Sequence, residues 1–348
     1  MKIVKHVVGI DVSSETFDVC FKAELEDQQR ITKGTRSFEN NAQGFRKYLD
    51  WCLKRNHKEV GLTHILEATG VYHENLCYYL HNQGEQVCVL LPQKVKYFIK
   101  SLNVKTKTDT TDAKAIAEYG LCCKFQLWEP LSENFKHIRD LCRTVSQLKK
   151  SKGALQSQLH ALNSSHNSNK EGLGAMEHLV NEHKKSIKEC EAAILALSKE
   201  DKGLWEKVER ITEIKGVQAL TVLKLLAETD GFRKVGSIKK LVSYAGLDVI
   251  ENQSGSRQGK TRISKKGNTF IREALYMPAL CATQHNKNMR AFYEMLEQRQ
   301  ATSKQGVVAV MRKLLVVIYS LWKSGRKYNE NHEWKEKGKV SLARRIAV

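Results

Sequence analysis

The stretch that decides the fold is residues 6–25, HVVGIDVSSETFDVCFKAEL. Its first part, HVVGIDVS (6–13), is a short apolar run rich in valine, and its second part, TFDVCFKAE (16–24), alternates with a period of two residues. Both patterns are typical of β-strands. Residues 29–40, QRITKGTRSFEN, continue with a third, more polar strand pattern. The chain therefore begins with three successive predicted strands.

Helix and strand patterns alternate after these strands. Residues 45–56 have the apolar spacing of a helix, residues 60–69 return to a strand, residues 75–84 are helical, and residues 85–92 close with a strand that ends at a proline. Three strands followed by helix, strand, helix and strand is the order of a ribonuclease-H-like (RuvC-like) sheet, although other α/β folds share it. We therefore predict an α/β domain over residues 1–130.

A different period begins at residue 138. Apolar residues recur at alternating steps of three and four from Ile138 to Leu162 and again from Met176 to Leu197, with the polar break NSSHNSNKEG between the two runs. Two such heptad runs predict a long antiparallel helical hairpin or coiled coil. The apolar seam either packs within one chain or pairs with another subunit, and the second alternative predicts a homo-oligomer.

The chain after the hairpin is mostly helical by the same criterion. The segment ITEIKGVQALTVLKLLAE around Gly216 resembles a helix-hairpin-helix, whose turn can hold a phosphate, but ordinary helix packing explains it equally well. The C-terminal end is rich in Lys, Glu and Arg, which predicts a flexible basic tail. The predicted fold class is thus α/β plus all-α, with four parts: an α/β domain (1–130), a coiled-coil hairpin (131–208), a helical domain (209–328) and a tail (329–348).

The composition limits the class of partner and the compartment. The 348 residues include 58 Lys and Arg against 38 Asp and Glu, a formal net charge of +20, which favours a polyanionic partner because neutralised phosphates release counterions. Nine scattered cysteines without a C-x-x-C pair argue against a zinc or disulfide framework. No apolar run approaches the roughly 20 residues of a membrane helix, and the apolar start is too short for a signal peptide. We therefore expect a cytoplasmic, nucleoid-associated protein without a membrane partner.

Carboxylates interrupt or follow apolar segments at three places. Asp11 ends the first strand, Glu67 lies in the strand HILEATG, and Asp109 and Asp112 open a predicted helix in KTKTDTTDAKAIAEYG. Taken singly, each acid has an ordinary explanation, since Asp109 could cap the helix and Asp112 could interact with its dipole. Taken together, the four acids predict a site for Mg²⁺ (or Mn²⁺), because such ions prefer hard oxygen ligands. Paired metal ions would stabilise the attacking and leaving oxygens of a phosphodiester exchange.

A second unusual stretch is SGSRQGKTRISKKGN, residues 254–268, which combines glycines, serines and five cations with no acid. A solvated loop would explain this composition. A nucleophilic serine on a flexible backbone, beside cations that screen phosphates, would explain it too. Ser254 is the preferred nucleophile and Ser256 its rival, whereas Ser264 is expected to cap the following helix. The predicted nucleic-acid-binding residues are the cations of this stretch and two lysines before the acidic helix: Arg257, Lys260, Arg262, Lys265, Lys266, Lys105 and Lys107.

These motifs together resemble a known family. GIDVS, ILEATG and KTDTTDA, followed far downstream by SG and ISKKGN, resemble the DEDD-type insertion-sequence transposases, the "insertion sequence one-ten" family with its "eleven-eleven" subgroup, to which Piv-type DNA invertases are related. The resemblance implies a RuvC-like N-terminal domain, a coiled coil that joins subunits, and a C-terminal transposase domain. It also implies a structured RNA, encoded by the element, that pairs with donor and target DNA. The catalytic residues that it implies are four metal-binding acids and a serine nucleophile: Asp11, Glu67, Asp109, Asp112 and Ser254.

The resulting prediction is a site-specific DNA transposase or recombinase that acts as a dimer or tetramer on double-stranded donor and target DNA, guided by an RNA. The alternative enzymes are a RuvC-like junction nuclease that uses water and a DNA invertase. The non-enzyme alternative is a nucleic-acid-binding regulator. The presence of all four acids argues against a decayed site, and an aromatic content of 7% argues against a single-strand binder based on stacking.

Overall fold

The computed structural model describes residues 2–57, 59–68, 70–103, 108–166, 169–255, 257–259, 262–298 and 302–330. Several sequence-based predictions lie outside these residues: those for Lys105, Lys107, Ser256, Lys260 and most of the tail. The chain divides into two compact units, Met1–Pro130 and Leu131–Val348, and each is described by itself.

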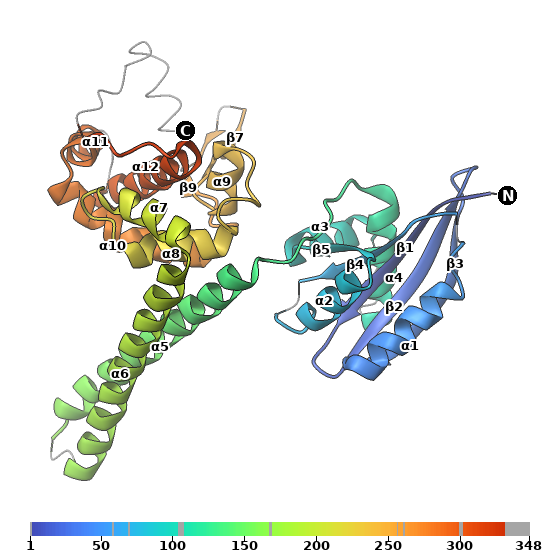
Figure 1. Ribbon diagram of the computed structural model, residues 1–348, viewed down its shortest axis with the longest axis horizontal. Helices are drawn as coiled ribbons and strands as arrows, with labels where there is room; N and C mark the ends of the chain where they lie inside the picture. The colour runs from blue at the N-terminus through green and yellow to red at the C-terminus, as the bar shows by residue number, and fades with distance from the viewer. Residues whose placement is uncertain are drawn as a thin grey trace. The chain divides into compact units, whose positions relative to one another are not determined.

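The first unit is built on a five-stranded sheet with the strand order β3-β2-β1-β4-β5 (Figure 1). Its strands are β1 (Ile3–Val12), β2 (Thr16–Leu25), β3 (Arg30–Glu39), β4 (Leu62–Glu67) and β5 (Gln86–Leu90). The first three strands pair antiparallel, and β4 and β5 add parallel to β1. The order of strands and helices along the chain agrees with the prediction from hydrophobic periodicity.

Helices cover both faces of this sheet, which explains why its central strands are apolar on both sides. They are α1 (Ala42–Leu53), α2 (Glu74–Asn82), α3 (Pro92–Ser101) and α4 (Asp109–Cys122). Val8 and Ile10 of β1 belong to the core that contains α1 and α2, whereas Val7 belongs to the core on the opposite face, with α3 and α4. Helix α3 was not predicted; its first residue, Pro92, suits the first turn of a helix because its fixed φ is already helical.

The second unit begins with the predicted helical hairpin. Helices α5 (Glu133–Asn163) and α6 (Lys170–Glu200) lie side by side (Figure 1). The seam is buried near the helical body, where Val145 and Ile187 join the main core of the unit. Toward the connecting turn the seam is less well covered, since Leu162 is 40% exposed. The hairpin is therefore present, while its pairing as a coiled coil between subunits stays a prediction.

The rest of the second unit is a helical body: α7 (Lys202–Thr212), α8 (Ala219–Thr229), α9 (Ile238–Tyr244), α10 (Thr269–His285), α11 (Lys287–Glu297) and α12 (Ser303–Ser324). Helix α7 runs across residue 208, and the predicted boundary between hairpin and helical domain stays a prediction. At Gly216, between α7 and α8, an added Cβ would lie 2.9 Å from the backbone nitrogen of Ala282 in α10. This close contact gives the glycine a packing role.

Helix α12 corrects one expectation. Within the described part of the chain it is the one helix that is long and apolar enough, by length and composition alone, to cross a membrane. The sequence-based statement that no apolar run approaches this length was therefore wrong. The reason for the apolar composition is visible in the packing, because Val310, Leu314 and Ile318 of α12 form part of the core of the helical body.

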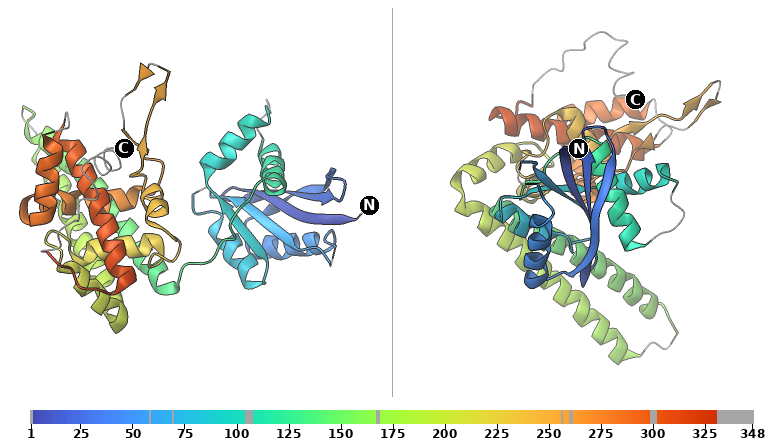
Figure 2. Two further views of the ribbon diagram at one scale, coloured as in Figure 1. Left: turned by 90° about the horizontal axis from the view of Figure 1, so that it is seen from above. Right: turned by 90° about the vertical axis from the view of Figure 1, so that its right-hand side faces the viewer.

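Short strands replace the loop expected at residues 254–268. Strand β6 (Val249–Ile250) pairs antiparallel with β9 (Arg262–Ile263), and β7 (Gln253–Ser254) pairs with β8 (Arg257–Gln258). Figure 2 shows this pair of ladders, called the basic hairpin below (residues 249–263), projecting from the helices of its unit. The backbone that carries Ser254 is thus hydrogen-bonded strand.

Candidate active site

Two of the predicted acids lie at the carboxyl ends of neighbouring parallel strands. In the parallel ladder of β1 and β4, Ile10 pairs with Leu66. The next residue of each strand, Asp11 in β1 and Glu67 in β4, therefore lies beside the other at the edge of the sheet. Because successive side chains of a strand point to opposite faces, Asp11 shares a face with Gly9. That face is the one covered by α4. The sheet therefore presents both carboxylates toward the beginning of α4.

Helix α4 packs directly on β1 because Gly9 has no side chain. A Cβ at Gly9 would lie 2.2 Å from the backbone nitrogen of Ala117 and 2.3 Å from the carbonyl oxygen of Ala113. Any larger residue would push the helix away from the strand. The glycine of the GIDVS motif thus sets the distance between Asp11 and the first turn of α4.

The first turn of α4 carries Asp109 and Asp112. The N-cap is Thr108, whose hydroxyl oxygen accepts a hydrogen bond from the backbone N–H of Thr111 at 3.2 Å, while the Thr111 hydroxyl oxygen accepts one from the backbone N–H of Thr108 at 2.8 Å. The alternative explanation of Asp109 as the helix cap is therefore wrong. The cap is supplied by a threonine, and both aspartates line the cavity in front of the helix.

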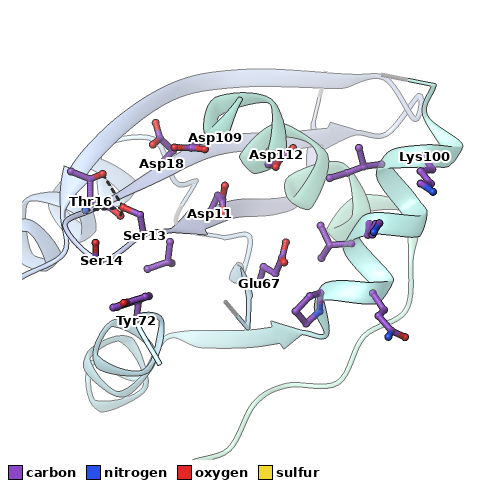
Figure 3. Close-up of a pocket in the computed structure, with 16 residues that line it drawn as sticks. Asp11, Ser13, Ser14, Thr16, Asp18, Glu67, Tyr72, Lys100, Asp109 and Asp112 are labelled. Atoms are coloured by element: carbon purple, nitrogen blue, oxygen red, sulfur yellow. Dashed lines mark hydrogen bonds between the residues drawn. The ribbon is translucent and has the colours of Figure 1, made fainter. Parts of the chain in front are cut away.

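The four predicted acids line one cavity of about 780 Å³. Figure 3 shows Asp11 near its centre, with Glu67, Asp109 and Asp112 around it. A fifth carboxylate, Asp18, also lines the cavity and lies beside Asp109. Asp18 was not singled out from the sequence. The period-two pattern of its strand and the tight turn at residues 13–15 were the features that could have placed it beside the end of the first strand. In the β1–β2 ladder Asp18 stands directly opposite Asp11.

Other side chains complete the walls of this cavity. Tyr72 lies at one end and Lys100 at the other, with the carboxylates between them (Figure 3). Lys96 of α3 also contributes to the lining. The two lysines were not singled out from the sequence because α3 itself was not predicted, and Tyr72, in the turn before α2, was not singled out either.

Burial and neighbouring carboxylates raise the affinity of Asp11 and Asp18 for protons. The pKa of Asp11 is raised to about 6, first by burial and then, in decreasing order, by the negative charges of Asp112, Glu67, Asp109 and Asp18. Burial also raises the pKa of Asp18, with a contribution from Asp109, while a hydrogen bond with Thr110 opposes the shift. Like charges held this close favour either a shared proton or a bound cation.

The carboxylates surround the cavity without closing on a single point. Among the residues that the structure describes, no three Asp, Glu, His or Cys side chains are grouped tightly enough to enclose an ion. The donor set nevertheless fits a divalent cation such as Mg²⁺, because that ion takes hard oxygen ligands and keeps several water molecules between itself and the protein. The five carboxylates around the cavity supply such ligands.

The candidate serine lies in the second unit. Ser254 is exposed on β7 and pairs with Arg257 of β8 across the turn at Gly255, whose φ of +56° is the left-handed conformation that glycine accepts readily. Arg262 lies on strand β9, which pairs with β6, and the exposed Lys265 and Lys266 follow it. The structure therefore places Ser254, Arg257 and Arg262 in one narrow hairpin.

The sequence suggested that Ser264 caps the following helix, but it does not. Its hydroxyl donates a hydrogen bond to a carboxylate oxygen of Asp248, which ties the two sides of the hairpin together. The N-cap of α10 is Asn268, whose side-chain oxygen accepts from the backbone N–H of Phe270 at 2.9 Å. The prediction for Ser264 was wrong because both residues are suitable caps and only the position of the helix start separates them.

Two models of known protein families match two separate parts of this chain. The model of the DEDD transposase domain of the IS110 group matches residues 8–166, and the model described as "Transposase IS116/IS110/IS902 family" matches residues 208–294. The pilin gene-inverting protein of Moraxella bovis is 30% identical over 332 residues, which cover 94% of this chain and 99% of that protein. The chain belongs to the IS110 family of transposases.

A more distant sequence relative agrees with this assignment. The transposase for insertion sequence element IS1111A of Coxiella burnetii is 23% identical over 83% of this chain and 80% of that protein. A structure of T. thermophilus RuvC in complex with a Holliday junction substrate matches 35% of this chain and 99% of that chain, at 14% identity; its TM-score of 0.27 is too low to assign a fold. As an IS110-family transposase the protein is an enzyme that cleaves phosphodiester bonds of DNA and transfers the DNA strands.

Proposed function

We propose that this IS110-family transposase exchanges DNA strands with a metal-binding set of carboxylates and a covalent serine nucleophile. The carboxylates are Asp11, Glu67, Asp109 and Asp112, and the serine is Ser254. The observation that carries the proposal is the convergence of the four acids, from two strand ends and one helix start, on a single cavity. We also infer that the first unit has the RNase H-like fold, which its strand order supports.

In the proposed reaction the oxygen of Ser254 attacks the scissile phosphorus. A bond between the serine oxygen and phosphorus forms while the bond from phosphorus to the leaving deoxyribose oxygen breaks; the serine loses its proton and the leaving oxygen gains one. The phosphoserine ester conserves the energy of the broken bond, so a DNA hydroxyl can later displace the serine and rejoin the strands. A bound divalent cation would supply charge neutralisation at the phosphate.

The basic residues would hold the DNA during this exchange. The cations of the stretch 254–268 can screen strand phosphates and stabilise the charge that develops in the transition state. We further propose that an RNA encoded by the element guides the choice of donor and target DNA. The formal net charge of +20 supports a large polyanionic partner.

We propose a homo-oligomer as the active form. The distal half of the α5–α6 hairpin carries partly exposed apolar residues, among them Leu162 at 40% and Leu179 at 44% exposed. A second copy of the hairpin would bury them. Whether two or four copies assemble is a separate question that the size of the complex in solution answers.

A water-using nuclease is the second candidate function. The observation in its favour is that the acidic cavity could activate water without any residue of the second unit. The two candidates differ in one product, since a serine nucleophile leaves protein attached to a DNA end and water does not. The test is therefore a search for this covalent product.

The experiment incubates the protein with donor DNA, any required RNA and Mg²⁺, then separates the products under denaturing conditions. We expect a denaturant-resistant, protease-sensitive DNA adduct whose peptide map places the linkage on Ser254. The Ser254→Ala variant should lose the adduct and recombination but keep DNA affinity. Normal cleavage by Ser254→Ala without any adduct would establish the water mechanism, whereas an adduct that disappears only when Ser256 is replaced would move the nucleophile by two residues.

A further inference from the structure

The end of the basic stretch, KKGN, is where the basic hairpin joins the helical body. The backbone N–H of Lys265 donates to the carbonyl oxygen of Gly246 at 3.1 Å, and that of Asn268 donates to the carbonyl oxygen of Tyr244 at 2.7 Å. A Cβ at Gly267 would lie 2.5 Å from both the nitrogen of Gly246 and the oxygen of Tyr244. The two chain segments therefore contact each other through their backbones. This region, residues 244–246 and 265–268, is called the foot of the hairpin below.

Asn268 fastens this foot in two directions. Its side-chain oxygen caps α10 by accepting hydrogen bonds from the backbone N–H groups of Phe270 and Ile271, at 2.9 and 3.3 Å. Its side-chain amide donates to Oε2 of Glu228 in α8, at 2.7 Å. A cap alone would not need an amide, because aspartate and serine serve equally well. The donor function of Asn268 is thus a separate feature of the site.

Glu228 is an unusual anchor because its side chain is only 3% exposed. Arg143 of α5 holds both of its carboxylate oxygens, with Nε at 2.8 Å from Oε1 and Nη2 at 2.9 Å from Oε2. The guanidinium also lies over the ring of Phe270, 4.8 Å from its centroid. A hydroxyl hydrogen bond from Tyr244 to the backbone oxygen of Glu228, at 3.1 Å, adds a further link to the foot.

Removing two charges from water costs free energy, so a buried ion pair adds little to stability by itself and can instead fix one geometry among several. The Arg143–Glu228–Asn268 chain connects three places that are distant in the sequence: the helical hairpin, the helix α8 and the foot. Ser146 of α5 adds a parallel link by donating to Glu273 of α10 at 2.6 Å. The foot is therefore held to rigid helices by directional hydrogen bonds.

We propose that Asn268 is a positioning residue for the strand-transfer reaction. Through Glu228 and Arg143 it fixes the foot of the basic hairpin on α8 and α5, and so determines where Ser254 is presented to the scissile phosphate. The inference rests on the proposed serine nucleophile. It assigns a role to the amide of the KKGN motif that neither helix capping nor phosphate binding requires.

The test is the Asn268→Asp variant, which keeps the capping oxygen and the size of the side chain but replaces the amide donor by a carboxylate facing Glu228. We expect the single-turnover rate of adduct formation to fall by about a hundredfold, the loss typical of a misplaced reacting group. DNA affinity should stay unchanged, and hydrogen exchange should accelerate at two backbone amides of the foot, those of Lys265 and Gly246.

The matched control is Asn41→Asp. Asn41 also caps a helix, α1, with its side-chain oxygen and donates its amide to a glutamate, Glu39, at 3.1 Å, but on an exposed surface. This variant should form the adduct at the wild-type rate. A rescue variant, Asn268→Asp with Glu228→Gln, exchanges the amide and the carboxylate and restores a donor between the two side chains. We expect it to recover about tenfold of the lost rate, and not all of it, because a glutamine leaves Arg143 with one accepting oxygen instead of two.

Arg143→Lys provides a second route should Asn268→Asp fold poorly, because lysine keeps the charge but cannot hold both oxygens; about a tenfold loss of rate is expected. An unimpaired adduct rate in Asn268→Asp, or a rescue variant as slow as the single one, would overturn the positioning role while leaving the nucleophile intact. A wild-type protein that never forms an adduct would overturn the serine mechanism and this role with it.

Discussion

The acidic cavity of the first unit and the basic hairpin of the second both concentrate charge of one sign, but they are built in opposite ways. The cavity collects carboxylates from Asp11 to Asp112 on a rigid sheet and helix, where burial raises the pKa of Asp11 to about 6. The basic hairpin and its foot take their cations from the fifteen consecutive residues 254–268, and Arg262, Lys265 and Lys266 are exposed. Within the foot of the hairpin, Ala245 and Gly246 are buried.

This difference separates two physical roles. Charges forced together away from water destabilise the folded chain and are tolerated where a counter-ion or a reaction requires them. Exposed charges on a narrow hairpin cost little and attract a polyanion over a distance set by the salt concentration. We therefore expect changes in the cavity to affect chemistry and changes in the hairpin cations to affect DNA affinity.

The largest expected effect follows neutralisation of the cavity. Each of Asp11→Asn, Glu67→Gln, Asp109→Asn and Asp112→Asn should reduce strand cleavage by about two to three orders of magnitude, because each removes a charge aimed at the reacting phosphate. Folding and DNA affinity should stay close to those of the wild type. Cleavage assays and binding titrations on the same preparations measure both.

The control for these variants is Asp50→Asn, an exposed acid of α1 that does not line the cavity. It should cleave at the wild-type rate. Near-normal cleavage by both Asp11→Asn and Asp112→Asn would exclude the metal site and remove one side of the comparison.

A smaller effect is expected from the hairpin. Replacing Lys260, Arg262 and Lys265 by Gln should weaken DNA binding and flatten its dependence on the logarithm of salt concentration by about two to three units, at about 0.9 per phosphate contact. Binding titrations from low to moderate salt measure this slope. The matched control replaces three exposed cations on the sheet face opposite α4: Arg46 and Lys47 of α1, and Lys54, which follows its last residue. Equal slopes for both triple variants would mean that the hairpin is only a solvated surface.

The smallest effect concerns stability. The pKa of Asp11 is about 6 in the folded chain and ordinarily 3.8, so between about pH 4 and 6 the folded state binds more protons than the unfolded state. The free energy of unfolding contributed by Asp11 therefore falls as the pH rises through this window, and the penalty remains above it. Asp11→Asn should be more stable than the wild type at pH 7 in the absence of divalent cations, and equally stable near pH 4.

Urea unfolding between pH 4 and 7.5, with a chelator present, measures this difference. Added Mg²⁺ or Mn²⁺ should stabilise the wild type at pH 7 more than it stabilises Asp11→Asn, because a ligand that binds the folded state shifts the equilibrium toward it. Parallel pH profiles of the two proteins would show that Asp11 ionises as an ordinary exposed aspartate and that the cavity is not electrostatically special.

Much of this protein could be predicted from local patterns. Period-two alternation and helical spacing gave the order of strands and helices in the first unit and the long hairpin of the second, because these periods follow directly from backbone geometry. The four acids stood out because a carboxylate such as Asp11 or Glu67 is costly at the end of an apolar strand unless it has a partner or a function. Their recurrence in three motifs also indicated the transposase family, to which the chain belongs.

Other features depended on which distant residues meet, and tertiary structure alone decided them. Asp18 joined the cavity because the β1–β2 register sets it opposite Asp11. Glu228 looks like an ordinary polar residue at the end of an apolar helix until Arg143 and Asn268, 85 and 40 residues away, satisfy it in the core. Sequence periodicity tells which face of an element is apolar, but the contacts between elements are fixed only when the whole chain packs, and buried polar groups are satisfied by those contacts.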